Sequence, residues 1–432
     1  VVAQTWDGTV PESDEKVSAS VAAAAKKALG VVDSGAVSSE KLVVIDDAKD
    51  GAKTKKPLQS VRAVYPYAAC NDPEAEAFIA YKQQGVLTED GTVWSWKFVN
   101  NLPKKIKYFV TSMKKSEFRR GIYMTAATVR NATGKFLADK LLASGGNTIV
   151  FDLNESDAVL KYKKGEQRGV LQDLSANVAE WKSRGIYVVA RIVAFKEKRI
   201  ARVYPGMAVK SAGGGVWRDR AGSTWLDPSN PDVVQYAIDM AKDAADMGVD
   251  EVQFDYVRFP TEGNLGSARF GFDQGKVAKW EVIRDFLREA RRQTIPLGVK
   301  LGADIFGIVG WQPAPNYKTT GQRIECIAPY LDTIYPMGYP SHFGPWFGGH
   351  KNPADEPYFF NKETNDNFVK YAEGTGAAIR PWLQAFMYRI TIPYNSDYMY
   401  QQIRAARDSG SDGFIFWNAG NAYDVVWPAI GR

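Results

Sequence analysis

Two aspartates at the ends of apolar runs are the residues best placed to do chemistry in this sequence. Asp255 lies near the end of the run 251–257, and Asp304 near the end of the run 298–306. Apolar residues alternate with both positions, so each carboxylate points to the face opposite the apolar one. Two neighbouring carboxylates can act as a nucleophile and a general acid, which is the chemistry of glycoside hydrolysis.

Asp152 and Arg191 hold equivalent positions in the two preceding runs. We expect Arg191 to keep Asp255 ionised as the nucleophile, while Asp304, without an obvious cation, holds its proton as the acid. Strand spacing predicts carboxyl groups about 5 to 6 Å apart, which suits a retaining mechanism. The alternative is a buried ion-pair network of all four residues with no catalytic role.

Aromatic and polar residues near the ends of the same runs predict a carbohydrate-binding site. Trp417 is the preferred platform for a sugar ring, and Arg258 could contact substrate or anchor its loop. The predicted substrate-binding residues are Asp152, Arg191, Arg258, Tyr339, Gln384, Trp417 and Asn418.

The elements that must position these residues alternate regularly along the chain. Short apolar runs are separated by amphipathic stretches, several of which end in glycine, as at Gly185 and Gly248. Eight such runs predict an α/β fold, a (β/α)8 TIM barrel, with the polar residues at the C-terminal ends of its strands. The runs are 121–126, 148–153, 187–192, 251–257, 298–306, 332–339, 379–386 and 413–419.

Three regions are expected. Residues 1–60 have few aromatics and are interpreted as an extension or linker, and residues 61–117 as a small accessory region. Residues 118–432 are the predicted TIM-barrel catalytic domain, which is long enough for a barrel with inserted loops.

Composition excludes several classes of function. The chain of 432 residues has two His and two Cys, so a multi-histidine zinc site is excluded, and Cys70 and Cys326 allow one disulfide at most. A net charge of +6 without a dense basic block argues against nucleic-acid binding. No run is long enough to span a membrane. We expect neither a metal nor a cofactor; the oligomeric state is left open.

An extracytoplasmic or secreted location is expected. The chain begins at Val1 without Met, which fits removal of a signal peptide and fits trimming equally well.

Three segments resemble a known family. They are GVDEVQFDYVRFP at 248–260, RGIY at 120–123 and WLDP at 225–228. From about residue 120 to the C-terminus the chain resembles a bacterial family of putative glycoside hydrolases with a TIM barrel, distantly related to the alpha-amylase type. The resemblance implies a glycoside hydrolase, usually exported, with a catalytic carboxylate at Asp255.

Two positions depart from the alpha-amylase pattern. Gln253 stands where that clan has Arg two residues before the nucleophile, and the fifth run ends in Asp304 rather than Glu.

The predicted function is a retaining glycoside hydrolase acting on a poly- or oligosaccharide. The main alternative is a carbohydrate-binding barrel without catalysis. A phosphate-ligand barrel is less favoured, because residues 386–388 provide no Gly-rich loop.

Overall fold

The computed structural model describes most of the region predicted to be the barrel. The predicted extension, 1–60, and most of the accessory region lie outside the described residues, so the domain boundaries stay a prediction. The described residues are 65–84, 86–88, 106–108, 117–154, 174–311 and 313–432.

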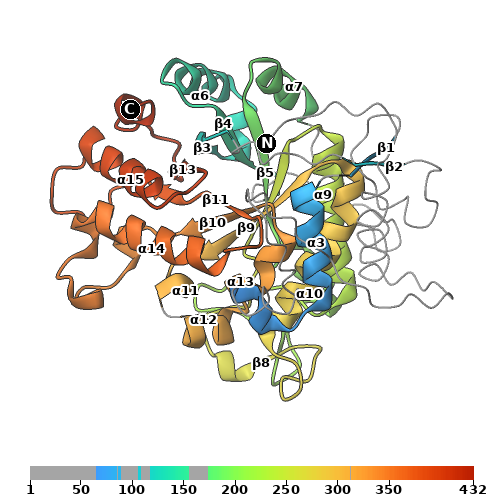
Figure 1. The fold of residues 1–432 in the computed structure, drawn as a ribbon. Coiled ribbons are helices and arrows are strands. Elements are labelled where there is room, and N and C mark those ends of the chain that lie inside the picture. Colours follow the sequence, from blue (N-terminus) through green and yellow to red (C-terminus); the bar gives the residue numbers. More distant parts are fainter. Residues whose placement is uncertain (1–64, 85, 89–105, 109–116, 155–173, 312) are drawn as a thin grey trace, which may run out of the picture.

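A parallel sheet of nine strands forms the centre of the molecule, and helices surround it (Figure 1). Its hydrogen-bonded order is β11-β10-β9-β7-β5-β4-β3-β13-β12. The strands are β3 (Arg119–Met124), β4 (Thr148–Asp152), β5 (Tyr187–Val193), β7 (Glu251–Asp255), β9 (Lys300–Phe306), β10 (Thr333–Met337), β11 (Ala378–Ile379), β12 (Trp382–Gln384) and β13 (Gly413–Trp417).

The two edge strands of this sheet belong to one stretch of chain. β11 pairs with β10 and β12 pairs with β13, and only Arg380 and Pro381 separate the two short strands. Proline has no N–H to donate, so a continuous ladder cannot pass through this point. The α/β prediction is confirmed, and the sheet is a curled, TIM-like barrel whose pairing is not continuous all the way round.

Helices connect the strands where the sequence pattern places amphipathic stretches. Three of the longer helices begin at asparagine caps, Asn131, Asn230 and Asn395, whose side chains accept backbone N–H groups of the first turn. The α-helices are α3 (Pro73–Gln84), α5 (Ala126–Val129), α6 (Ala132–Ala143), α7 (Ser175–Ser183), α8 (Arg199–Val203), α9 (Pro231–Asp246), α10 (Lys279–Thr294), α11 (Ile308–Trp311), α12 (Pro313–Thr320), α13 (Ile324–Ile327), α14 (Pro357–Tyr371), α15 (Ser396–Asp408) and α16 (Trp427–Ile430).

Short elements complete the fold outside the main sheet. Two antiparallel pairs are β1 (Val86–Thr88) with β2 (Ile106–Tyr108), and β6 (Lys210–Ser211) with β8 (Ala268–Arg269). The 3-10 helices are η1 (Pro66–Cys70), η2 (Pro205–Met207), η3 (Leu265–Ser267), η4 (Ile295–Leu297), η5 (Ala328–Tyr330), η6 (Pro340–His342), η7 (Phe347–Gly349) and η8 (Pro353–Asp355).

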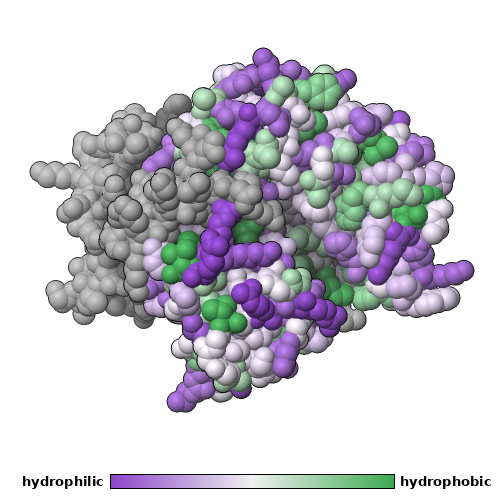
Figure 2. All heavy atoms as spheres, turned by 180° about the vertical axis from the view of Figure 1, so that it is seen from behind, coloured by the Kyte–Doolittle hydropathy of each residue, from purple (hydrophilic) through white to green (hydrophobic). Residues whose placement is uncertain are grey.

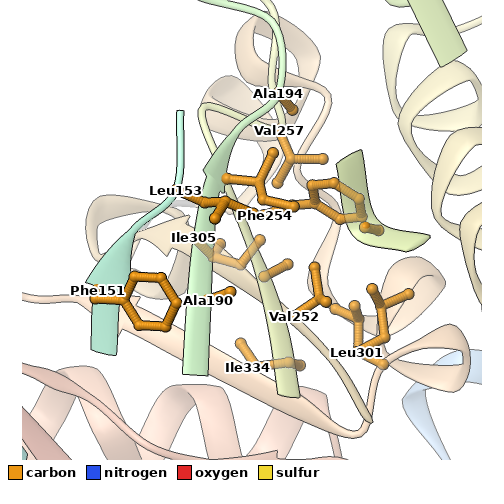
Figure 3. Close-up of a cluster of buried hydrophobic side chains, with 14 of the residues drawn as sticks. Phe151, Leu153, Ala190, Ala194, Val252, Phe254, Val257, Leu301, Ile305 and Ile334 are labelled. Atoms are coloured by element: carbon orange, nitrogen blue, oxygen red, sulfur yellow. The ribbon is translucent and has the colours of Figure 1, made fainter. Parts of the chain in front are cut away.

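Alternating side chains of the strands build the core between the sheet and the helices. Phe151, Val252, Phe254, Leu301 and Ile305 are fully buried and belong to one apolar cluster (Figure 3). These are the positions that alternation assigned to the helix-facing row, so the opposite positions of the same strands face the inside of the barrel.

The segment 65–84 is fastened to the barrel by a disulfide and by packing. Cys70 and Cys326 form the one bridge that the two cysteines allow. The Phe78 ring lies edge-on to Tyr330 at 5.0 Å between centroids. Lys82 Nζ donates to the backbone oxygens of η5 and of the residue that follows it, at 3.1 and 2.9 Å.

Figure 2 shows hydrophilic and hydrophobic residues interspersed over the described part of one face. Among the described residues, no helix has the length and apolar character needed to cross a bilayer.

Lys82 should make the stability of the protein depend on pH. Burial lowers its pKa from 10.5 to about 7, so the folded protein releases a proton that the unfolded chain keeps. The free energy of unfolding should therefore rise between pH 7 and pH 10, and Lys82→Met should lack this contribution. Denaturant unfolding at pH 6.5 and 9.5 should show the wild type gaining about 3 kcal/mol relative to the variant. An unchanged difference would contradict the prediction.

Candidate functional site

Arg191 joins carboxylates from three strands at the C-terminal end of the barrel. On β5 it lies opposite Asp152 of β4, and its Nη1 donates to that carboxylate. Towards β7, Nη2 and Nε donate to Asp255 Oδ2 at 2.5 and 3.1 Å. Towards β9, Nε lies 3.8 Å from Asp304 Oδ2. The four predicted residues are thus brought together, as alternation along the strands requires.

Asp304 is the most deeply buried of the three carboxylates, with 1% of its surface exposed. Trp382 Nε1 donates to its Oδ1 at 2.7 Å, while Oδ2 has no hydrogen-bond partner among the described residues. Burial and the neighbouring Asp255 raise the pKa of Asp304 well above its usual value, against the opposing influence of Arg191 and Trp382. This aspartate is suited to hold a proton at neutral pH.

Asp255 is held by a strained turn at the end of its strand. Tyr256 has a φ of +51°, and its N–H donates to Asp255 Oδ1 at 2.5 Å. Such a conformation costs of order 1 to 3 kcal/mol for a residue other than glycine and is concentrated at functional sites. Alternation along the run 251–257 predicts that Tyr256 faces the helices together with Val252 and Phe254; the turn instead places Tyr256 at the pocket wall.

The distances to Arg191 set an upper limit on the separation of the two carboxylates. Asp255 Oδ2 and Asp304 Oδ2 are both less than 4 Å from Arg191 Nε, so the two oxygens are no more than about 7 Å apart.

The carboxylates form part of the wall of a pocket of about 960 Å³. Six of the predicted site residues line it: Asp255, Asp304, Arg191, Arg258, Tyr339 and Trp417. The pocket is also lined by aromatic side chains that were not among the predicted site residues, including Phe306, Phe343, Phe347, Phe386 and Tyr388.

The other three predicted residues, Asp152, Gln384 and Asn418, do not line the pocket and form hydrogen bonds within the protein. Asp152 accepts hydrogen bonds from Arg191 and from Tyr123 Oη. Gln384 accepts the backbone N–H of Ser341 at 3.2 Å and donates to the oxygen of Phe386 at 2.9 Å. It therefore positions two loops of the mouth rather than facing the space between them.

Asn418 organises the chain after the last strand. Its Nδ2 donates to Ala385 O at 2.5 Å, and its Oδ1 accepts the N–H groups of Gly420 and Ala422. It does not line the pocket, in contrast to its neighbour Trp417, whose ring lies 6.1 Å from that of Tyr123.

Arg258 both anchors its loop and faces the pocket. Its Nη1 donates to Phe259 O at 3.0 Å, and its guanidinium lies 4.2 Å from the centre of the Phe306 ring and 4.9 Å from that of Trp225. Burial lowers the pKa of Arg258 from its usual value, partly offset by Asp255. The two roles considered for Arg258 from the sequence, anchoring its loop and contacting substrate, are therefore compatible in one side chain.

A second buried network lies near the opposite ends of the strands. Glu251 accepts hydrogen bonds from Tyr187 Oη at 2.8 Å and Tyr335 Oη at 2.7 Å, and it pairs with Arg380 at 3.2 Å. None of these residues lines the pocket. This is the position in which a purely structural network is expected in a barrel. The Arg191 network differs because two of its carboxylates, Asp255 and Asp304, line a cavity.

No group of three or more His, Cys, Asp or Glu suited to a metal ion is found within the described ranges. His342 lines the pocket, 5.0 Å from the Tyr339 ring, and burial lowers its pKa.

Comparison with known proteins identifies a family for most of the barrel. A family model described as a putative glycosyl hydrolase domain matches residues 121–423. No curated protein sequence matches.

Two solved structures illustrate the similarity. The glycoside hydrolase domain of PgaB (BpsB) from Bordetella bronchiseptica is 13% identical, over 70% of this chain and 94% of that one, with a TM-score of 0.51. A hypothetical protein from Ruminiclostridium thermocellum is 34% identical over 43% of this chain and 97% of that one, with a TM-score of 0.37. The first shares the fold; these comparisons give no specific link to the alpha-amylase type.

Trp382→Phe should raise the pKa of Asp304 further, because it removes an N–H that stabilises the ionised carboxylate. Carbon-13 NMR of labelled aspartate carboxyl groups should show this titration moving to higher pH. Trp225→Phe is the matched control, because the indole of Trp225 donates instead to Asp219. A shift to lower pH in Trp382→Phe, or an equal shift in the control, would contradict the assignment.

Proposed function

The chain belongs to the family of putative glycosyl hydrolase domains, and on this premise we propose that it hydrolyses a poly- or oligosaccharide with retention of configuration. One observation carries the proposal: Asp255 and Asp304 share Arg191 at the wall of a large pocket at the C-terminal end of the barrel. That end is where barrel enzymes hold their catalytic residues.

The two carboxylates have unequal surroundings, which supports different roles. Asp255 accepts two guanidinium hydrogen bonds and one backbone hydrogen bond, so its charge is stabilised for attack on the anomeric carbon. Asp304, with its raised pKa, gives its proton to the leaving glycosidic oxygen. The resulting glycosyl ester is hydrolysed by a water whose proton returns to Asp304.

Aromatic side chains around the pocket support a carbohydrate substrate. Trp417 is half-buried and lies between Tyr339 and Phe386, with ring centres 6.0 and 5.3 Å away. Tyr388 is 47% exposed at the rim. Flat apolar faces beside a few charged groups suit sugar rings, which have apolar faces and polar edges.

A carbohydrate-binding barrel without catalysis is the second candidate. The near-complete burial of Asp304 favours it, because a general acid must come within hydrogen-bond reach of the glycosidic oxygen. Release of reducing ends from a panel of bacterial and plant polysaccharides separates the two: binding without any release would support the second candidate.

An extracytoplasmic location is part of the proposal. The Cys70–Cys326 disulfide supports it, because such bridges persist mainly in oxidising compartments.

Asp255→Asn and Asp304→Asn should each lower kcat by at least about a thousandfold, because each removes one half of the carboxylate pair. Asp285→Asn on the outer helix α10 is the control and should retain activity, since it makes only surface ion pairs. Near-normal kcat in either site variant would rule out the assigned pair.

Rescue with azide distinguishes the two roles. Asp255→Ala with azide should give a glycosyl azide of inverted configuration, and Asp304→Ala with azide one of retained configuration. The same anomer from both variants would contradict the assignment of nucleophile and acid.

Tyr388→Ala should raise KM for the polysaccharide cleaved in the panel by roughly fivefold and leave kcat within about twofold. The exposed ring can stack on a sugar outside the reacting bond, and such contacts contribute of order 1 kcal/mol. Steady-state kinetics measures both constants. A fall in kcat with unchanged KM would place Tyr388 at the chemical step instead.

A further inference from the structure

A line of hollows continues from the carboxylate pocket across the neighbouring surface. A second hollow of about 450 Å³ shares Lys196 and Tyr256 with the main pocket. A third, of about 680 Å³, shares Lys198 and Arg199 with the second. Because adjacent hollows have wall residues in common, the three lie next to one another, and we refer to this line of hollows as the path.

Positive charge increases along this path. The main pocket has carboxylates among its wall residues, whereas the third hollow has four cations and no acidic residue. The cations are Lys198, Arg199, Arg202 and Arg218. Three of them, Lys198, Arg202 and Arg218, are exposed and form no ion pair with any residue that the structure describes.

The one acidic side chain in the second hollow is turned to the backbone. Glu197 is 8% exposed, and its carboxylate accepts the N–H of Arg199 at 2.8 Å. Burial raises the pKa of Glu197, against the opposing influence of Arg199 and of backbone N–H groups. Its carboxylate is thus directed to the backbone at the start of α8, while Lys198, Arg202 and Arg218 remain exposed.

Neighbouring loops hold the cations in place. Arg218 pairs with Thr224 in an antiparallel bridge, and its Nη1 donates to Gly222 O at 3.0 Å. Thr224 Oγ1 in turn donates to Glu197 O at 2.8 Å. The wall carrying Arg218 is thereby joined to the segment that carries Lys198 and Arg199.

We propose that this basic path binds an anionic glycan, so that the substrate carries carboxylate, sulfate or phosphate groups on sugars beyond the cleaved bond. The inference rests on the proposed function, because it extends from the same pocket. A guanidinium forms paired hydrogen bonds with all three anions. Exposed charges contribute little individually, so binding requires several contacts and weakens with salt.

Binding is tested in an Asp255→Asn background, so that no ligand is consumed, by titration calorimetry at 20 and 200 mM NaCl. Each anionic probe has a neutral partner: oligogalacturonate with its methyl ester, dextran sulfate with dextran, and phosphomannan with dephosphorylated phosphomannan. A single-stranded oligonucleotide is the fourth probe. The pairs separate carboxylate, sulfate and phosphate as the recognised group.

Arg202→Gln with Arg218→Gln removes two charges from the path. Lys135→Gln with Lys140→Gln is the matched control, because it removes the same charge from exposed positions on α6. We expect at least one anionic glycan to bind at least about tenfold more tightly than its neutral partner at low salt. The path variant should lose most of this difference, and the control should keep it.

Three results would overturn the inference: equal binding of every charged and neutral pair, equal losses in the path variant and the control, or tighter binding of the oligonucleotide than of every glycan. Since binding is measured without turnover, an inactive wild-type protein would count against the proposed hydrolysis alone. Conversely, hydrolysis of a neutral glycan together with equal binding would count against the basic path alone.

Discussion

The candidate site depends on one guanidinium shared by three buried carboxylates. Arg191 is 6% exposed and contacts Asp152, Asp255 and Asp304 on three neighbouring strands. Its single positive charge cannot neutralise three negative ones, which favours protonation of the carboxylate that it stabilises least. Asp304, deepest and farthest from the guanidinium, has the raised pKa. Removing the arginine would leave unpaired buried charges, at about 3 to 5 kcal/mol.

Alternation along the strands predicted the fold and the centre of the site. A parallel strand buried on its outer face must place every second residue outward, so Asp255 and Asp304 could be assigned inward from the sequence. The same rule turns Tyr123 and Trp382 inward. Their residue types alone did not indicate that Tyr123 donates a hydrogen bond to Asp152 and Trp382 one to Asp304. Gln384 and Asn418 were also predicted to face the site from their positions. Their side-chain amides instead form hydrogen bonds with backbone groups of loops, whose course follows no periodicity in the sequence.

Two features were beyond the reach of periodicity. The turn at Tyr256 reverses the expected side because one residue adopts a left-handed conformation. The basic path combines Lys198, Arg199 and Arg202 with Arg218, from a separate loop. A stretch that includes three consecutive glycines, 213–215, separates Arg202 from Arg218 in the sequence. The distribution of charges along the chain therefore does not show that Arg218 lies beside the other three cations.

The Cys70–Cys326 bridge closes a covalent ring around the candidate site. Arg191 and its three carboxylate partners all lie between the two cysteines in the sequence, 256 positions apart. A single peptide-bond cleavage anywhere within this ring leaves one molecule, with every strand of the site still covalently attached. A nicked protein would run as a single chain on a non-reducing gel and separate into fragments only after reduction.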